Sequence, residues 1–139
     1  MSTRPHLFFD ENVSHVYVDA LRPLLKRATM SSHRAEKLTG LADVDLFDRL
    51  SPLGFGAIVT LDSMQLRNED ELAGLRRNKL HWIGLSTPDG RGMTVHSQVI
   101  SSLMFGLPQV LDDWRDEPHS YHLPVVTSRN SALVTARKL

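Results

Sequence analysis

The chain has 139 residues, 41% of them hydrophobic, and its 16 Lys and Arg residues balance 16 Asp and Glu residues. At this length we expect one domain over 1–139. Cysteine is absent, which excludes disulfide frameworks, thiolate metal sites and cysteine nucleophiles. No apolar stretch approaches the ~18 residues that would span a bilayer, and no secretory signal is visible, so we expect a cytoplasmic protein without a membrane contact.

Short apolar runs alternate with amphipathic stretches along most of the chain. In chain order we expect a strand at 6–10, a helix at 13–27, a strand at 28–32, a helix at 44–50, a strand at 56–61, a helix at 68–79, a strand at 80–86, a helical stretch at 94–114, and strands at 121–127 and 132–136.

Several residues mark where these helices should begin, kink or end. Pro23 is expected to kink or end the first helix, and Gly106 and Pro108 to interrupt the last one. Asp43 stands at the expected N-cap of the second helix. Asn68 and Glu71 have the spacing of a capping box at the start of the third.

Strands that alternate with helices predict a three-layer α/β/α domain with a mainly parallel central sheet. Residues 56–61 are apolar on both faces, which is typical of a central strand. Ligands of such sheets bind beyond the carboxyl ends of the strands, where the strand order reverses. Acidic side chains at these strand ends are therefore the candidates for a ligand-binding site.

Asp10 follows the first strand, Asp62 follows the strand at 56–61, and Asp43 begins the helix between them. If the sheet is parallel, the three carboxylates meet at one edge, where their repulsion calls for a cation. Oxygen ligands without His or Cys favour Mg²⁺ or Mn²⁺ over zinc. Taken one at a time, each acid is also explained as a helix or turn cap.

The three motifs carrying these acids resemble the PIN-like domains of VapC-type toxins, in the subgroup that begins with Asp-Glu-Asn. The motifs are Phe-Phe-Asp-Glu-Asn at 8–12, Gly-Leu-Ala-Asp at 40–43 and Ile-Val-Thr-Leu-Asp at 58–62, within a motif-bearing core at 6–86. The resemblance implies a Mg²⁺- or Mn²⁺-dependent endoribonuclease with Asp10, Asp43 and Asp62 as catalytic and metal-binding residues. No motif matches residues 93–139, where we expect a helix and a tail.

The resemblance also implies supporting residues. Glu11 and Asn12 would orient Asp10 or a metal-bound water, and Thr60 would support the acidic pocket. Arg34 and Arg67 are candidates for holding a substrate phosphate, although each is also a plausible solvated surface residue. The fourth acid that PIN nucleases usually carry has four candidates here: Asp45, Glu69, Asp70 and Asp89.

The partners implied by the resemblance are an RNA substrate and a cognate antitoxin protein with a DNA-binding domain, and a homodimer is one assembly that it allows. Two other functions fit the same residues. One is a non-catalytic PIN-like interaction module that has lost full metal-site competence. The other is a receiver-like phosphoacceptor, which would need a Thr or Ser and a Lys at later strand ends.

Overall fold

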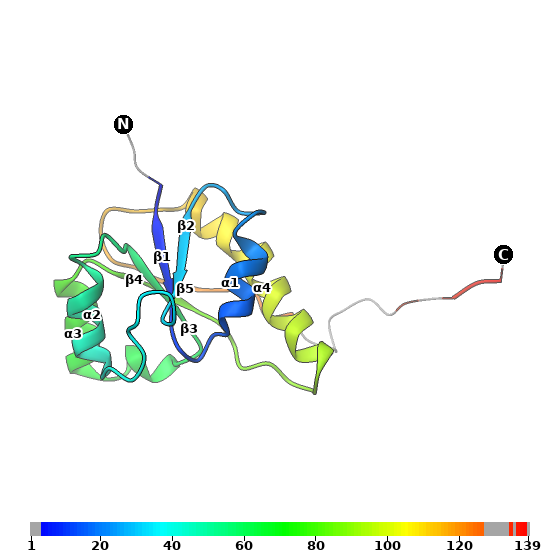
Figure 1. Ribbon diagram of the computed structural model, residues 1–139, viewed down its shortest axis with the longest axis horizontal. Helices are drawn as coiled ribbons and strands as arrows, with labels where there is room; N and C mark the ends of the chain where they lie inside the picture. The colour runs from blue at the N-terminus through cyan, green and yellow to red at the C-terminus, as the bar shows by residue number, and fades with distance from the viewer. Residues whose placement is uncertain (1–3, 127–133, 135, 139) are drawn as a thin grey trace.

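The computed structural model describes residues 4–126, 134 and 136–138 (Figure 1). Its five strands form one parallel sheet in the order β2-β1-β3-β4-β5. The strands are β1 (His6–Phe9), β2 (Thr29–Ser32), β3 (Ala57–Thr60), β4 (His81–Gly84) and β5 (Ser120–His122). The helices are α1 (His15–Leu21), α2 (Asp43–Leu50), the 3₁₀ helix η1 (Ser63–Leu66), α3 (Glu69–Arg77) and α4 (Met93–Asp112).

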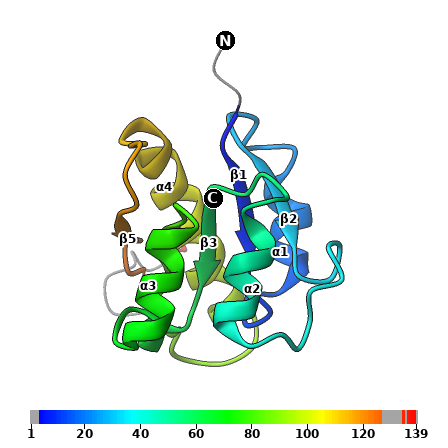
Figure 2. The same cartoon turned by 90° about the vertical axis from the view of Figure 1, so that its left-hand side faces the viewer.

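Helices cover both faces of the sheet, so the predicted three-layer α/β/α architecture is confirmed. Helices α1 and α4 lie on one face and α2 and α3 on the other (Figure 1). Figure 2 shows α2 and α3 side by side in front of the sheet, with β3 behind them. The predicted central strand is β3, which has two strands on either side.

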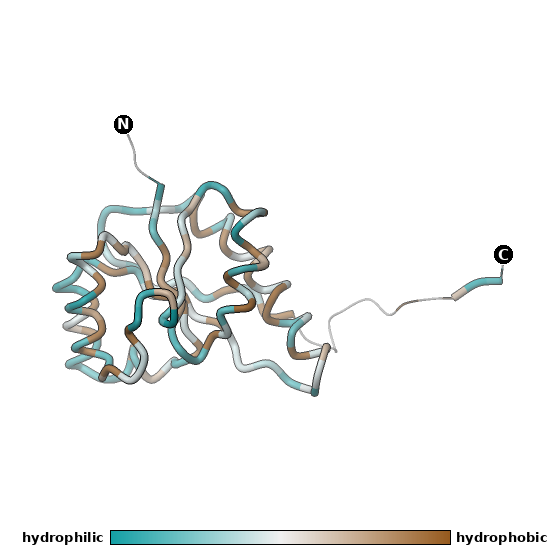
Figure 3. The backbone as a smooth tube through the Cα atoms, in the orientation of Figure 1, coloured by the Kyte–Doolittle hydropathy of each residue, from teal (hydrophilic) through white to brown (hydrophobic). Residues whose placement is uncertain are grey.

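Each face of the sheet has its own hydrophobic core, because successive side chains of a strand point to opposite faces. Phe9, Val59 and Ile83 pack against α1 and α4, whereas Phe8 and Ile58 pack against α2 and α3. The tube in Figure 3 is accordingly brown along the central strands and alternates in colour along the helices. A residue two positions after Phe8 or Ile58 therefore lies on the α2/α3 side.

Helix α4 runs through both residues that were expected to interrupt it, so that prediction was wrong. A Cβ atom on Gly106 would lie 2.5 Å from Leu123 Cδ2 and 2.9 Å from Pro124 Cδ. The glycine is thus needed for the close approach of the chain after β5 rather than for a break. Pro108 lacks an amide hydrogen but remains within the helix.

Two other expectations also change. Helix α1 ends at Leu21, shortly before Pro23, so it is much shorter than the expected 13–27. Of the two strands expected in the tail, the first, at 121–127, is realised only as the shorter β5, and the second, at 132–136, falls mostly outside the described residues. Among the helices that the structure describes, none combines the length and apolar character that crossing a membrane requires.

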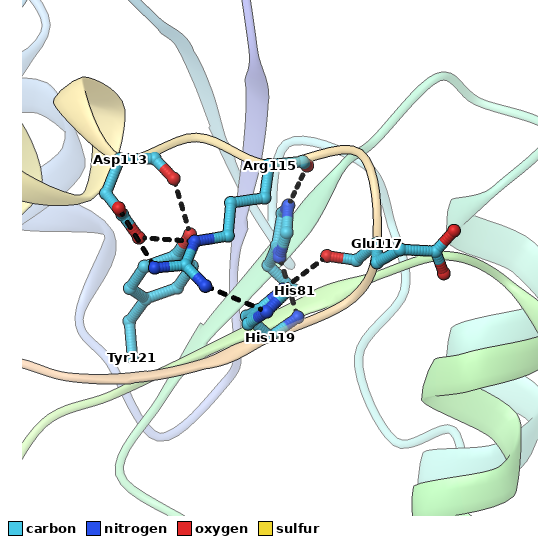
Figure 4. A network of polar contacts seen from close by, with 6 residues as sticks. All are labelled: His81, Asp113, Arg115, Glu117, His119 and Tyr121. Atoms are coloured by element: carbon cyan, nitrogen blue, oxygen red, sulfur yellow. Dashed lines mark hydrogen bonds and ion pairs between the residues drawn. The ribbon is translucent and has the colours of Figure 1, made fainter.

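The edge strand β5 is held by a polar network at the amino end of β4 (Figure 4). The buried ring of His81 accepts a hydrogen bond from the His119 amide at Nδ1 (2.9 Å) and lies 2.9 Å from the Arg115 carbonyl oxygen at Nε2. Arg115 forms an ion pair with Asp113, whose carbonyl oxygen accepts from the Tyr121 hydroxyl. These contacts tie the segment after α4 to the sheet.

Candidate functional site

The strand order reverses between β1 and β3, and acids follow both strands. Asp10 comes directly after β1, and Asp62 stands two residues after the end of β3. Because the two strands are parallel neighbours, their carboxyl ends lie at the same edge of the sheet. Such a reversal is where open α/β sheets bind their ligands.

Asp10 is buried, with 6% of its surface exposed, and its carboxylate is held by three donors. Oδ1 accepts from the Glu11 amide at 2.8 Å. Oδ2 accepts from Thr60 Oγ1 at 2.9 Å and from Gln65 Nε2 at 3.3 Å. Burial raises the pKa of Asp10, the three donors oppose this, and the nearby charge of Asp43 raises the pKa further.

Thr60 connects three residues at this edge through one hydroxyl group. Its Oγ1 donates to Asp10 and accepts from Asn12 Nδ2 and from the Asp62 amide, both at 3.0 Å. Asn12 in turn accepts from the Leu61 amide through Oδ1, also at 3.0 Å. The segment after β1 is thereby fastened to the segment after β3.

Asp62 has a capping role as well as its place beside the other acids. Its Oδ1 accepts from the Met64 amide at 3.0 Å and so caps η1. Helix capping therefore accounts for the hydrogen bond to Oδ1 of this carboxylate. The charge of Asp62 also raises the pKa of Glu71, which places the two acids near each other.

Asp43 is the first residue of α2 and not its N-cap, which corrects the sequence-based prediction. The N-cap is Ala42, and no side chain caps this helix. The Asp43 carboxyl group instead shares a hydrogen bond with Glu71, in the first turn of the neighbouring helix α3. Burial and the charges of Asp43 and Asp62 raise the pKa of Glu71 to about 7, so the pair holds a proton near neutral pH.

Glu71 was missed as a member of this site because its spacing from Asn68 is that of a capping box. Asn68 does cap α3, accepting from the amides of Asp70 and Glu71. The Glu71 side chain, however, turns to Asp43. The four residues expected to supply the fourth acid are all exposed: Asp45, Glu69, Asp70 and Asp89. The signal available in the sequence was that α2 and α3 each begin with acids.

Gln65 is a second residue that no sequence pattern singled out. It is fully buried in η1, and its Nε2 donates to Asp10. Its Oε1 has no hydrogen-bond partner in the part of the chain that the structure describes. A buried amide with one free oxygen beside a buried carboxylate is unusual, because such atoms are normally paired.

A family model described as a PIN like domain matches residues 5–87 of the chain. The chain belongs to the PIN-like domain family. The match extends from β1 to just beyond β4 and so includes all four acids. No curated protein and no solved structure gives a significant match.

The remaining predicted residues lie around the acids of this PIN-like domain. Glu11 is exposed, and its Oε2 accepts from the Gly40 amide at 3.3 Å, which holds the loop leading to α2. Arg67 is exposed just after η1. Arg34 is exposed after β2, with its guanidinium 3.4 Å from the His15 ring. Both guanidinium groups are thus on the surface of the described part of the chain.

The acids of the PIN-like domain form a row rather than a closed set of ligands. The charge of Asp43 acts on Asp10, the Asp43 carboxyl group shares a hydrogen bond with Glu71, and the charge of Asp62 acts on Glu71. Within the described residues, no three His, Asp or Glu side chains are grouped so that they could hold a metal ion. The donor set is all oxygen, which suits a hard divalent cation, and the repulsion within the row would be relieved by one.

Proposed function

We propose that this PIN-like domain is a Mg²⁺- or Mn²⁺-dependent endoribonuclease that hydrolyses RNA phosphodiester bonds. The observation that carries the proposal is that Asp10 and Asp62 follow the parallel strands β1 and β3 at the edge where the strand order reverses, and that the hydrogen-bonded Asp43–Glu71 pair interacts with both. Carboxylates gathered at this edge of the sheet repel one another. A divalent cation would relieve that repulsion.

Asp10, Asp43, Asp62 and Glu71 are the residues that would hold the cation. When bound, such a cation lowers the pKa of a water molecule and neutralises charge on a phosphate. The chain itself positions the site. Thr60 and the Glu11 amide fix both oxygens of Asp10, and the Asp43–Glu71 pair would release its proton to the solvent if both carboxyl groups became ligands.

The substrate must be held by local charges, because the chain has no net charge. Arg67 is the better placed of the two candidate arginines, since it follows Asp62 and η1 after the central strand β3. Arg34 lies after the edge strand β2. We propose that Arg67 binds a phosphate beside the cleaved bond and that Arg34 binds one further along the strand.

A cleavage assay on end-labelled single-stranded RNA tests the proposal. We expect cleavage with Mn²⁺ or Mg²⁺ that EDTA stops, and loss of at least about a hundredfold in Asp10→Asn, Asp43→Asn and Asp62→Asn. Asp45→Asn is the matched control, because Asp45 is exposed on the same helix as Asp43. Cleavage that persists in all three acid variants would reject the site.

We further propose that the protein is the toxin of a type II toxin–antitoxin pair of the VapC type. The protein would be cytoplasmic, and its partner would be a cognate antitoxin with a DNA-binding domain. A homodimer is one form in which it would act. The support is the likeness of the three motifs to those toxins. Induced expression should arrest bacterial growth, and Asp10→Asn should abolish the arrest.

A non-catalytic interaction module is the second candidate, favoured by the lack of three grouped ligands in the described residues. Calorimetric titration with Mn²⁺ separates the two functions, because an interaction module predicts no binding at millimolar metal. The receiver-like alternative has less support, since Leu123 and Pro124 follow β5 where that function needs a lysine.

A further inference from the structure

A hollow lies at the same edge of the sheet, one strand beyond Asp62. It has a volume of about 240 Å³ and opens between the ends of β3, β4 and β5. Its wall includes both a residue next to Asp62 and the segment that follows β4. The residues that give it its chemistry are Ser63, Trp82, Gly84, Ser86, Thr87 and His122.

The hollow is lined by aromatic rings and by hydroxyl groups. The rings of Trp82 and His122 lie 5.1 Å apart at 58°, and the His122 side chain is exposed. Ser63, Ser86 and Thr87 are exposed as well. None of the lining residues is Lys, Arg, Asp or Glu. The hollow therefore suits an uncharged planar ring with polar edges better than a phosphate or a cation.

Gly84 determines how the Trp82 ring lies. A Cβ atom at Gly84 would fall 2.0 Å from a carbon of that ring, so the indole lies flat over the glycine along β4. This orientation takes the ring toward the carboxyl edge of the sheet, on the α2/α3 side where Thr60 and Asp10 also lie. The Nε1–H of Trp82 is buried without an acceptor in the described residues.

We propose that this hollow is a base-binding subsite, which takes one unpaired base of the polynucleotide whose phosphate reaches the acids. The inference rests on the proposed nuclease function for its substrate class. Unpaired bases are recognised by stacking on aromatic side chains and by hydrogen bonds to their polar edges. His122 supplies the exposed stacking face, and the hydroxyl groups of Ser86 and Thr87 supply donors and acceptors.

The test measures binding of a labelled single-stranded oligoribonucleotide in EDTA, by fluorescence anisotropy, so that metal-dependent cleavage is silent. His122→Ala should weaken binding about tenfold. Phe105→Ala is the matched control, because Phe105 is also an exposed ring and lies on α4, across the sheet. The unfolding midpoint of His122→Ala should equal that of the wild type, since the side chain is exposed.

A single abasic position moved along the oligonucleotide identifies the base concerned. At one position it should weaken wild-type binding about tenfold and leave binding by His122→Ala unchanged, because the two changes remove the same contact. Trp82 fluorescence in Trp114→Phe, which leaves Trp82 as the single tryptophan, should be quenched by the intact strand and less by the abasic one.

The outcomes separate this subsite from the nuclease proposal. The subsite would be overturned if His122→Ala bound the oligonucleotide with wild-type affinity. It would also be overturned if the losses caused by the substitution and by the abasic position were additive at every position, or if the wild type bound no oligonucleotide. Cleavage that continues normally in that variant leaves the nuclease proposal intact. Coupled binding without any cleavage supports the subsite and rejects the nuclease.

Discussion

Asp43 and Glu71 share a hydrogen bond between the first turns of two adjacent helices, α2 and α3. Acids in a first helical turn usually complement the helix dipole and face solvent. Here two of them face each other, and burial, the hydrogen bond with Asp43 and the charges of Asp43 and Asp62 together raise the pKa of Glu71 to about 7. Removing the charge of Glu71 has a consequence for folding that does not depend on any metal.

Glu71→Gln should be more stable than the wild type at pH 8 and equally stable near pH 4. The pKa of Glu71 is raised from 4.5 to about 7 in the folded state, so folding becomes less favourable as pH rises between these values. Because solvent screens the pair, we expect a gain of about 1 kcal/mol at pH 8. Urea unfolding at both pH values measures it, with Asp70→Asn as the exposed neighbouring control. A loss of stability at pH 8 would contradict the repulsion.

Thr60→Val should destabilise the protein by about 2 kcal/mol, because the buried Asp10 carboxylate loses a donor and two donors lose their acceptor. Thr60→Ser retains the hydroxyl group and should recover most of the loss. Urea midpoints for the two variants provide the comparison. Equal stability of the valine variant and the wild type would show that the hydroxyl group is not the connection described.

Divalent cations should raise the unfolding temperature of the wild type through binding to the folded state. At a Mn²⁺ concentration a hundred times the dissociation constant, the stabilisation is about 2.7 kcal/mol. Asp43→Asn should reduce the shift strongly and Asp45→Asn should leave it unchanged. Calorimetric scans with Mn²⁺ and with EDTA measure the effect. A shift of the same size in both variants would place the cation elsewhere.

The contribution of His81 to the stability of the wild type should be lost as pH falls through about 6.5, which is opposite in sign to the contribution of Glu71. Burial lowers the pKa of His81, so the unfolded chain binds a proton at a pH where the folded ring does not. His81→Gln should be less stable than the wild type at pH 7.5, and the difference in stability between the two should be smaller at pH 5.5. Urea midpoints at pH 7.5 and 5.5 test this, with His122→Gln as the exposed control. An unchanged pH dependence in His81→Gln would assign the titration to another group.

Gly106→Ala should destabilise the protein by about 1–3 kcal/mol, although alanine is the better helix former. The added methyl group meets Leu123 and Pro124 at less than 3.0 Å, so the chain after β5 must move. Ser97→Ala, at an exposed position of the same helix, should be neutral or slightly stabilising. Chemical denaturation of both variants shows whether the close packing at Gly106 outweighs the higher helix propensity of alanine. A more stable Gly106→Ala would mean that Leu123 and Pro124 move away from the added methyl group without a measurable loss of stability.

The sheet could be predicted from the sequence because its strands are short, apolar and separated by helical patterns. Asp10 and Asp62 were accessible to the same reasoning, since each follows a strand and parallel strands share an edge. What could not be predicted was the direction of individual side chains. Glu71 has the spacing of a cap and faces Asp43 instead, and nothing about Gln65 in the sequence indicates that it is buried against Asp10.

The errors in α4 have a similar origin. Gly106 and Pro108 weaken a helix locally, and local reasoning therefore placed an interruption there. The glycine is explained only by Leu123 and Pro124, which are distant in the sequence. Long-range packing of this kind overrides local preference.

The four acids come from four separate elements: the segments after β1 and β3, and the first turns of α2 and α3. A peptide excised from any one of these elements would contain only part of the set of acids and could not form the Asp43–Glu71 hydrogen bond. When the whole chain unfolds, its affinity for the cation should therefore be lost in the same cooperative transition. A fragment that ends before residue 71 should not bind any divalent cation.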